Sequence, residues 1–228
     1  EDLSRGLGDV YKRQSSPFTT SSLQQEVGKR FGLPAKKIMA IAQSLYESGH
    51  ITYHRTDSLN LSDQVIKSIK DYILSNFTDK YYKGRRYKAS SKGAQEAHEA
   101  IRPTKIERDT IQTGDKNEEK VYEMIWKRTV ASQMSEMVYD EFKMLIDISN
   151  REEEEFTSKG EEVLFDGFKK VYNYDTPKDT ISANTELFKQ LKSGDILEYH
   201  KIISTETHSK AQGRYSEPTL IKKMEKYG

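Results

Sequence analysis

The chain has 228 residues, no cysteine, and 37 Lys and Arg against 36 Asp and Glu, so its formal charge is +1. The lack of cysteine excludes disulfides, thiolate catalysis and cysteine-ligated zinc, and the balanced charge gives no overall attraction to nucleic acid. No apolar run reaches the roughly 18 residues of a membrane span, and no signal-peptide pattern opens the chain. Because 10% of the residues are aromatic, we expect a folded, very soluble protein. The lack of cysteine and of membrane or export signals favours the cytoplasm and no membrane partner.

The first fourteen residues, EDLSRGLGDVYKRQ, show no clear periodicity and do not begin with Met. We therefore predict that residues 1–14 are an unrelated lead-in of artificial origin, outside the fold.

Two amphipathic helices are predicted next. A capping box of Ser22 and Gln25 begins the first helix and Gly32 ends it, while Pro34 lies in the first turn of the second, which ends at Gly49. Their apolar faces carry Leu23, Val27 and Phe31, and then Ile38, Ile41, Ala42, Leu45 and Tyr46. The pair resembles a helix-turn-helix, although plain packing of two helices explains the pattern at least as well.

A third helix, capped by Ser62, is predicted before a polar stretch at residues 79–105. The helix has an inner side of Val65, Ile66, Ile69, Ile73 and Phe77. The polar stretch interleaves basic and aromatic residues, namely Lys80, Lys83, Arg85, Arg86, Lys88 and Lys92 with Tyr81, Tyr82 and Tyr87. This mixture suits phosphates and base faces, and a solvated loop is an equally good interpretation.

The second half of the chain changes from helical to alternating periodicity. Residues 118–134 predict another amphipathic helix, and beyond Tyr139 the apolar residues alternate, at Phe142, Met144, Ile146 and Ile148. Turn signals follow at Asn150, Gly160, Asp166 and Gly194. The acidic run at residues 152–155 predicts a solvated hairpin end, and Ser216 caps a closing helix. The fold class expected is α+β.

The stretch HITYHRTDSLNLS, residues 50–62, gathers groups suited to phosphate chemistry. On an extended segment Tyr53, Arg55 and Asp57 share one side and His54 takes the other. A phenol is a weak nucleophile near neutral pH, and a guanidinium binds phosphate oxygens in a fork and stabilises developing charge. The pair indicates a tyrosine directed at a phosphodiester. A strand with a buried tyrosine and a surface ion pair is the alternative that spacing alone favours.

His98 and Arg102 lie four residues apart, on one face if their stretch is helical, before Pro103 forces an end. They are candidates for a second phosphate-directed cluster. The five histidines, at 50, 54, 98, 200 and 208, show no metal-ligand spacing, so no metal site is predicted in this chain.

Taken in order, five segments resemble the motifs of bacterial type IA DNA topoisomerases. They are PFTTSSLQQEV, AKKIMAIAQSLYESGHITYHRTDS, EAHEAIRPT, LFDGFKKVY and GRYSEPTLIKKMEKYG. The resemblance covers residues 17–228, and EAHEAIRPT is similar to the topoisomerase I branch. It implies a parent isomerase that relaxes negatively supercoiled DNA without ATP. Such an enzyme would cleave and rejoin a single strand through a 5′-phosphotyrosine link. It would work in the cytoplasm, at the nucleoid.

The resemblance also implies roles for single residues. Tyr53 would be the nucleophile, Arg55 would stabilise the transition state, and His98 would bind the scissile phosphate. DNA contacts are expected from Arg102, Lys83, Arg85, Arg86, Tyr87, Lys88 and Arg214. His54 departs from the methionine or proline common in the family, and we interpret it as a tolerated variant.

The resemblance divides the chain into a helical tyrosine domain at 15–135, a β-rich hinge or arch domain at 136–206, and the start of a helical base domain at 207–228. The family's Toprim domain, which holds Mg²⁺, is not found here. We therefore expect a fragment that needs the Toprim domain and the rest of the base domain as partners and cleaves poorly alone. The rival hypothesis is a non-catalytic module that binds single-stranded nucleic acid through its helix-turn-helix-like unit.

Overall fold

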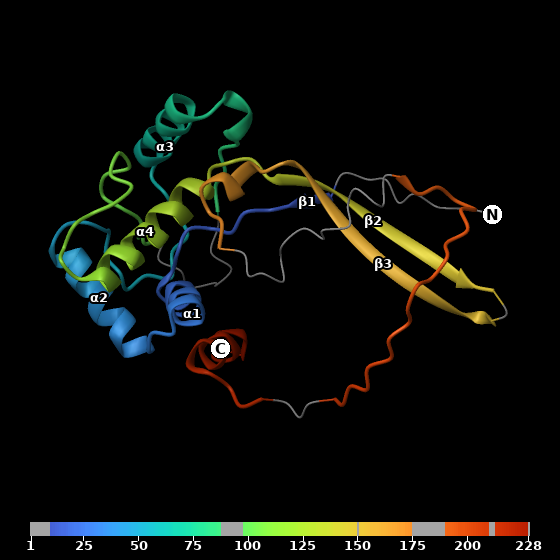
Figure 1. Cartoon of the computed structure of the whole chain (residues 1–228). Helices are drawn as coiled ribbons and strands as arrows, with labels where there is room; N and C mark the ends of the chain where they lie inside the picture. Colours follow the sequence, from blue (N-terminus) through green and yellow to red (C-terminus); the bar gives the residue numbers. More distant parts are fainter. Residues whose placement is uncertain (1–9, 88–97, 150, 175–189, 210–212, 228) are drawn as a thin grey trace. The chain divides into compact units, whose positions relative to one another are not determined.

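The computed structural model describes residues 10–87, 98–149, 151–174, 190–209 and 213–227, and it has the predicted α+β character (Figure 1). It divides into two compact units. The helical unit holds the described residues of Arg13–Glu136, Gly167–Asn173 and Arg214–Gly228. The hairpin unit holds those of Glu1–Lys12, Met137–Asp166 and Tyr174–Gly213. Within the described ranges, no helix combines the length and apolar character that crossing a membrane requires.

The helical unit is built from five α-helices and two short 3-10 turns among the residues described. The helices are α1 (Thr20–Phe31), α2 (Ala35–Glu47), α3 (Asp63–Asn76), α4 (Lys116–Ala131) and α6 (Glu217–Tyr227), and the turns are η1 (Asp79–Tyr81) and η2 (Gly167–Lys170). Their shared core includes the fully buried side chains Leu23, Ile38, Leu45, Ile69, Ile73, Met124 and Ile125. Burial of these side chains is the main stabilising contribution to this unit.

Helix α1 begins three residues earlier than its predicted capping box. Thr19 is the N-cap, and its hydroxyl accepts from the Ser22 amide while the Ser22 hydroxyl accepts from the Thr19 amide. The predicted box of Ser22 and Gln25 is therefore wrong, because Thr19 already takes the extended backbone that an N-cap requires. The predicted stop is confirmed, since Gly32 has φ of 66° and its amide bonds the Gly28 carbonyl.

Helices α2 and α3 match the predicted apolar spacing except at one end. Pro34 is the N-cap of α2, one position before the first turn in which we placed it, and Tyr46 is 40% exposed instead of facing the core. Ser62 is the N-cap of α3, but its side chain makes no capping hydrogen bond. Its backbone amide instead bonds Glu99, so a distant carboxylate takes part in starting this helix.

The central helix α4 anchors the loop that precedes it. The Trp126 indole donates to the Ile106 carbonyl at 2.8 Å, and the Tyr122 hydroxyl donates to the Arg108 carbonyl at 2.7 Å. Ile106 is itself only 4% exposed. Buried polar tips of aromatic residues need partners, so these two bonds hold residues 106–108 on the helix.

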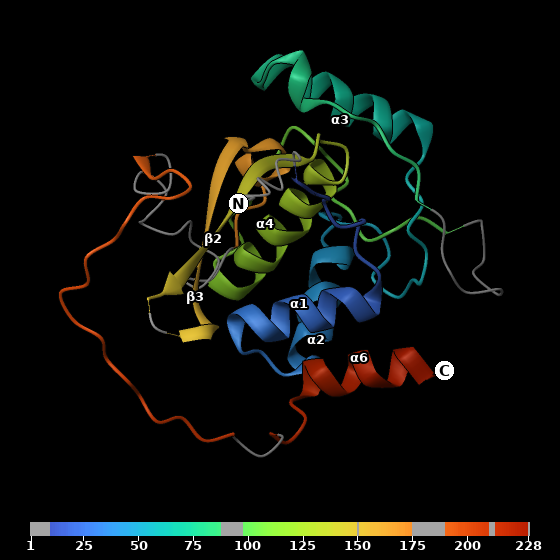
Figure 2. The same ribbon diagram turned by 90° about the vertical axis from the view of Figure 1, so that its right-hand side faces the viewer.

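Helix α6 lies alongside α1 in both views (Figures 1 and 2). The Glu225 carboxylate accepts from Ser21 and Gln25, and the Glu217 carboxylate accepts from the Ala35 amide at 2.6 Å. Both carboxylates therefore lie at helix N-termini, where the helix dipole favours negative charge. No residue of α6 is buried, although the Pro218 ring packs beside Gly28 of α1.

The hairpin unit contains a three-stranded antiparallel sheet. Its strands are β1 (Val10–Lys12), β2 (Met137–Ile148) and β3 (Arg151–Phe165), in the order β1-β2-β3. The alternation predicted along β2 is confirmed, because Phe142, Met144, Ile146 and Ile148 are half-buried and the residues between them are exposed.

Two predictions for the residues in and next to this sheet are wrong. Val10–Lys12 pairs with β2 instead of lying outside the fold, and Gln14 is buried with hydrogen bonds to two backbone carbonyls. Gly160 does not turn the chain but pairs with Phe142 inside β3, where an aromatic neighbour covers a strand glycine. In the described residues 190–209 there is no strand.

Candidate functional site

Three extended segments of the helical unit lie side by side around Tyr53. Ile51 forms an antiparallel bridge with Pro103, and Phe18 forms another with Ile101. The described residues before Pro103 are therefore not helical, so the condition under which His98 and Arg102 would share a helix face is not met. The physical reason is that Pro103 disfavours helical backbone at the residue before it, while the bridges supply the hydrogen bonds that a helix would otherwise make.

Two threonine hydroxyls hold the backbone on either side of the tyrosine. The Thr52 hydroxyl donates to the Ala100 carbonyl at 2.7 Å and accepts from the Arg102 amide at 3.0 Å. The Thr20 hydroxyl, in the first turn of α1, donates to the His54 carbonyl at 2.7 Å and accepts from the Thr56 amide at 2.9 Å. Sequence reasoning missed both roles, because a lone threonine carries no local signal for a partner over thirty residues away.

Side chains alternate along the tyrosine segment as predicted. Tyr53, Arg55 and Asp57 are exposed, whereas His54 and Thr56 are buried. The backbone bends at His54 and Arg55 instead of forming a regular strand. The alternation survives because the hydrogen bonds to Thr20 fix which peptide groups face inward.

The Tyr53 ring is accessible to solvent, and neighbouring rings contact it. It is 44% exposed, and it makes edge contacts with the Tyr46 and His54 rings, both at 5.2 Å between centroids. Such contacts are worth about 0.5–1.5 kcal/mol each beyond the area that they bury. The ring is therefore held at the surface in a restricted orientation.

His54 is 1% exposed, and neither of its ring nitrogens has a hydrogen-bond partner among the described residues. Burial, followed by the positive charge of Arg55, lowers the pKa of His54, and Glu47 opposes this shift. The imidazole is thus neutral at pH 7. It contributes a packing surface behind Tyr53 and no charge.

Arg102 is held by a neighbouring carboxylate. Glu99 pairs with its guanidinium and also accepts from the Ser62 amide, and Arg102 donates further to the Pro103 carbonyl at 3.0 Å. Burial acts to raise the pKa of Glu99, but the hydrogen bonds from Arg102 and Ser62 outweigh it and lower that pKa. His98 is exposed where this segment begins.

The predicted basic and aromatic stretch is partly engaged within the fold. Lys83 pairs with Glu136 at 3.0 Å, and Arg85 pairs with the same carboxylate. Burial acts to raise the pKa of Glu136, and its hydrogen bonds and these two cations lower it below the usual range. The Tyr87 hydroxyl donates to the Ser132 carbonyl at 2.9 Å, and its pKa is raised by burial.

The remaining predicted DNA contacts are surface groups. Arg86 pairs with Asp63, both largely exposed, and Arg214 is exposed shortly before α6. Lys88 lies outside the described residues. Three of the predicted contacts, Lys83, Arg85 and Tyr87, are therefore tied to the end of α4 and the residues after it.

The described ranges contain no group of three or more His, Cys, Asp or Glu side chains that could hold a metal ion. The family resemblance assigns Mg²⁺ to the Toprim domain, so none of the residues described here is assigned to it.

Comparison with known proteins connects the site to a family. A family model described as DNA topoisomerase matches residues 9–228. DNA topoisomerase 1 of Rickettsia felis is 41% identical over 233 residues, which cover 95% of this chain and 30% of that protein. The Synechocystis DNA topoisomerase 1 is 38% identical over 223 residues, covering 95% of this chain and 24% of its own.

A solved structure gives the same result in three dimensions. Full-length topoisomerase I from Thermotoga maritima matches 97% of this chain with a TM-score of 0.73 and 28% identity. The matched region is 36% of the Thermotoga chain. The chain thus spans well under half the length of each of these relatives.

Proposed function

The chain belongs to the bacterial DNA topoisomerase I family, and from that premise we propose that it carries the tyrosine with which such an enzyme cuts and rejoins one strand of DNA. Tyr53 is the proposed nucleophile, and single-stranded or negatively supercoiled DNA is the proposed substrate. Relaxation of supercoils, independence from ATP and work at the nucleoid are proposed for the whole enzyme. The observation that carries the proposal is the exposed Tyr53 ring on a backbone held from both sides.

Restricted motion is what a nucleophile of this kind needs. The hydroxyls of Thr20 and Thr52 fix the peptide groups around the tyrosine, and Tyr46 and His54 restrict its ring. Holding a reacting group near its attack geometry removes entropy from the barrier before the substrate arrives. The exposed side of the segment is left open to a phosphodiester.

The proposed reaction is a transesterification. The Tyr53 oxygen attacks the phosphorus, and the bond from that phosphorus to the 3′ oxygen of the preceding nucleotide breaks. The phenolic proton leaves the tyrosine, and the departing 3′ oxygen ends as a hydroxyl. One phosphodiester is exchanged for another, so the reverse attack by that hydroxyl rejoins the strand without an external energy source.

Arg55 and His98 are proposed to act on the phosphate. Arg55 is exposed on the same side of the segment as Tyr53, where its guanidinium can pair with phosphate oxygens while negative charge builds. His98 is exposed on the neighbouring segment and is proposed to hydrogen-bond the same group. Arg102, which Glu99 already neutralises in part, is proposed to contact a neighbouring phosphate.

Magnesium is proposed for the whole enzyme, held by residues beyond those described here. When bound, it would neutralise phosphate charge next to the strand being cut. Cleavage by this chain alone is accordingly expected to be weak.

The test is a covalent adduct assay with 3′-end-labelled single-stranded DNA and Mg²⁺. The labelled strand is incubated with the chain, with and without a separately expressed Toprim domain from the family, and then denatured. We expect a labelled protein band only when both proteins are present. Tyr53→Phe should abolish it, and Tyr46→Phe, which changes the adjacent exposed tyrosine, should keep it.

Two results would contradict the proposal. An adduct that survives Tyr53→Phe would place the nucleophile elsewhere. Binding of the oligonucleotide with no adduct under any of these conditions would favour the rival, a non-catalytic module that only holds single strands.

A further inference from the structure

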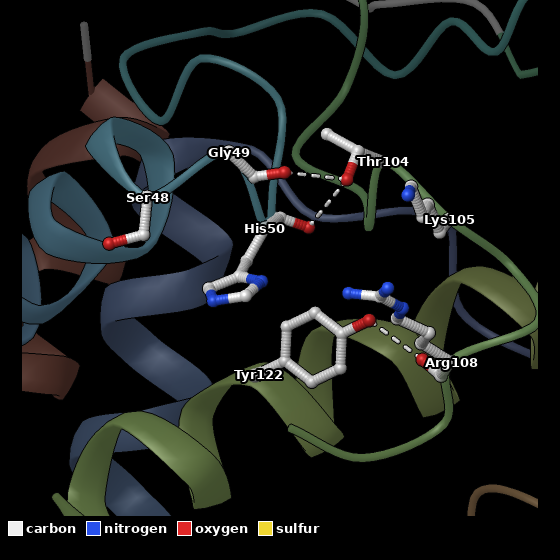
Figure 3. Close-up of a pocket in the computed structure, with 7 residues that line it drawn as sticks. All are labelled: Ser48, Gly49, His50, Thr104, Lys105, Arg108 and Tyr122. Carbon is white, nitrogen blue, oxygen red and sulfur yellow. Dashed lines mark hydrogen bonds between the residues drawn. The ribbon is translucent and has the colours of Figure 1, made fainter. Parts of the chain in front are cut away.

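A polar pocket lies at the start of the tyrosine segment. Its lining residues are Ser48, Gly49, His50, Thr104, Lys105, Arg108 and Tyr122 (Figure 3). They come from the end of α2, the start of the tyrosine segment, the loop after Pro103 and the helix α4. Neither the predicted site residues nor the proposed reaction uses any of them.

The pocket is formed before any ligand arrives. The Thr104 hydroxyl donates to the Gly49 carbonyl at 2.7 Å, and the Thr104 amide donates to the His50 carbonyl at 3.0 Å. Helix α4 fixes the other wall through the bonds from Tyr122 to Arg108 and from Trp126 to Ile106. A ligand therefore has little backbone ordering to induce, which lowers the entropic cost of binding.

The lining is basic. Lys105, Arg108 and His50 supply nitrogen-bearing side chains, and Figure 3 shows the His50 ring and the Arg108 guanidinium turned toward the same open space. No carboxylate belongs to the lining, although the charges of Asp109 and Glu107 act on the Tyr122 phenol behind it. Within the part of the chain that the structure describes, neither Lys105 nor Arg108 has a salt-bridge partner.

The floor of the pocket is a buried aromatic ring. Tyr122 is 1% exposed and lies at 6.0 Å, edge to face, from the His50 ring. Burial raises its pKa to about 12, so the phenol stays neutral and its hydroxyl keeps donating to the Arg108 carbonyl. The floor residue itself therefore carries no negative charge.

The location connects the pocket with Tyr53. His50 precedes Tyr53 by three residues, which span at most about 11 Å of extended chain. The bridge between Ile51 and Pro103 connects the pocket with the tyrosine. On the two bridged segments, His50 and Thr104 lie on the pocket side of the bridge, and Tyr53 and Arg102 lie on the other side. A strand running past Tyr53 along this edge would pass the pocket within a few nucleotides.

We propose that the pocket formed by His50, Lys105 and Arg108 binds a backbone phosphate of the single strand that is cut at Tyr53, away from the scissile phosphate. This inference rests on the proposed function, because it assigns a further contact to the same substrate. Lys105 and Arg108 supply the charge, and His50 and Thr104 border the phosphate oxygens. The contact carries no sequence information and acts on affinity and register.

The test measures the affinity of the whole chain for a fluorescent single-stranded oligonucleotide over a range of salt concentrations. Lys105→Ala with Arg108→Ala is compared with Lys36→Ala with Lys37→Ala, which removes the same charge from exposed positions at the start of α2. We expect the pocket variant to bind at least several-fold more weakly. The slope of the logarithm of the binding constant against the logarithm of the salt concentration should become smaller by about 0.7 for each phosphate that the protein no longer neutralises. The Lys36 and Lys37 variant should change the affinity and the slope of its salt dependence much less.

Equal effects of the two double variants would overturn the inference, because they would show a response to net charge alone. Far-ultraviolet circular dichroism and Trp126 fluorescence check that both variants fold. If the unaltered chain binds no single strand at all, the proposed function fails as well. If it binds but the pocket variant is unaffected, only the pocket assignment fails.

A second measurement identifies the ligand. Inorganic phosphate is titrated while the His50 ring signal is followed by NMR, with His50→Gln to assign it, and the oligonucleotide is titrated in parallel. We expect the oligonucleotide to shift the signal at far lower concentration than phosphate does. Saturation by phosphate at comparable concentration would assign the pocket to a free anion and overturn the DNA contact.

Discussion

The exposed position of Tyr53 depends on the residues beside it. Its two neighbours, Thr52 and His54, turn inward: the Thr52 hydroxyl donates to the Ala100 carbonyl and the His54 side chain is buried. A residue between two inward-facing neighbours must point out, since side chains alternate on extended backbone. The accessibility of the nucleophile is therefore a property of the segment as much as of the tyrosine.

His54 gives a pH-dependent prediction at this scale. Because its pKa is lower in the folded state than the ordinary value of 6.5, the unfolded chain takes up more protons as the pH falls. Its contribution to stability is complete above about pH 6.5 and is lost as the pH falls toward the folded-state pKa. His54→Phe keeps an aromatic ring and removes this loss.

The measurement is the free energy of unfolding in urea, followed by Trp126 fluorescence between pH 5 and pH 8. Trp126 is the single tryptophan of the chain and is buried in the helical unit. As the pH falls below 6.5, the free energy of unfolding of the unaltered chain should fall more than that of His54→Phe. A constant difference across the range would mean that His54 titrates alike in both states.

At the scale of elements, α1 and the tyrosine segment form one structure. The first turn of α1 supplies Thr20, whose amide donates to the Thr56 carbonyl at 2.9 Å while its hydroxyl serves two further backbone groups. Helix N-termini carry amides without partners inside the helix, and here one of them binds the tyrosine segment. The start of α1 thus sets the position of the nucleophile.

Thr20→Val tests this coupling with a side chain of nearly the same shape. It leaves the buried Thr56 amide without its acceptor, and we expect a loss of about 1–3 kcal/mol in the free energy of unfolding. Thr20→Ser keeps the hydroxyl and should lose less. The measurement is the free energy of unfolding of both variants, followed by Trp126 fluorescence. Equal losses in the two variants would mean that the loss does not come from the Thr20 hydroxyl.

At the scale of the whole chain, the helical unit is assembled from three separate stretches of sequence. The hairpin departs after Glu136, and the chain rejoins the helical unit at Gly167. Those two residues are neighbours in space, since a Cβ added to Gly167 would lie 2.2 Å from the Glu136 carbonyl oxygen. A short link between them would therefore close the helical unit without strain.

Replacing residues 137–166 by a short glycine and serine linker, and removing residues 1–12, should leave the helical unit folded. We expect Trp126 fluorescence in the native range and a cooperative urea transition. If a soluble quencher reaches Trp126 and the urea titration shows no cooperative transition, the helical unit needs the hairpin to fold. The prediction follows from the separate core of the helical unit.

Local pattern predicted much of the fold because it reports on single elements. The apolar spacing of α2 and α3, the glycine stop of α1 and the alternation of β2 each follow from the period of one element. Caps were less predictable, since Thr19 and Ser22 both suit an N-cap and only the tertiary position of the chain chooses between them. The segment of His98 and Arg102 had the spacing of a helix, but its backbone partners lie elsewhere in the chain.

The sequence by itself determined the family, the helical and alternating elements, and the opposite directions of Tyr53 and His54, because all of these depend on neighbouring residues and their periodicity. Only the tertiary structure decided that Tyr53 is the exposed one of the two and what lies beside it. The pairing of residues 101–103 with Phe18 and Ile51, and the use of Glu136 to hold Lys83 and Arg85, depend on contacts between distant parts of the chain. The pocket of His50, Lys105 and Arg108 arises in the same way. Buried backbone groups must find partners wherever the packed core places them, and no local pattern records which partners those will be.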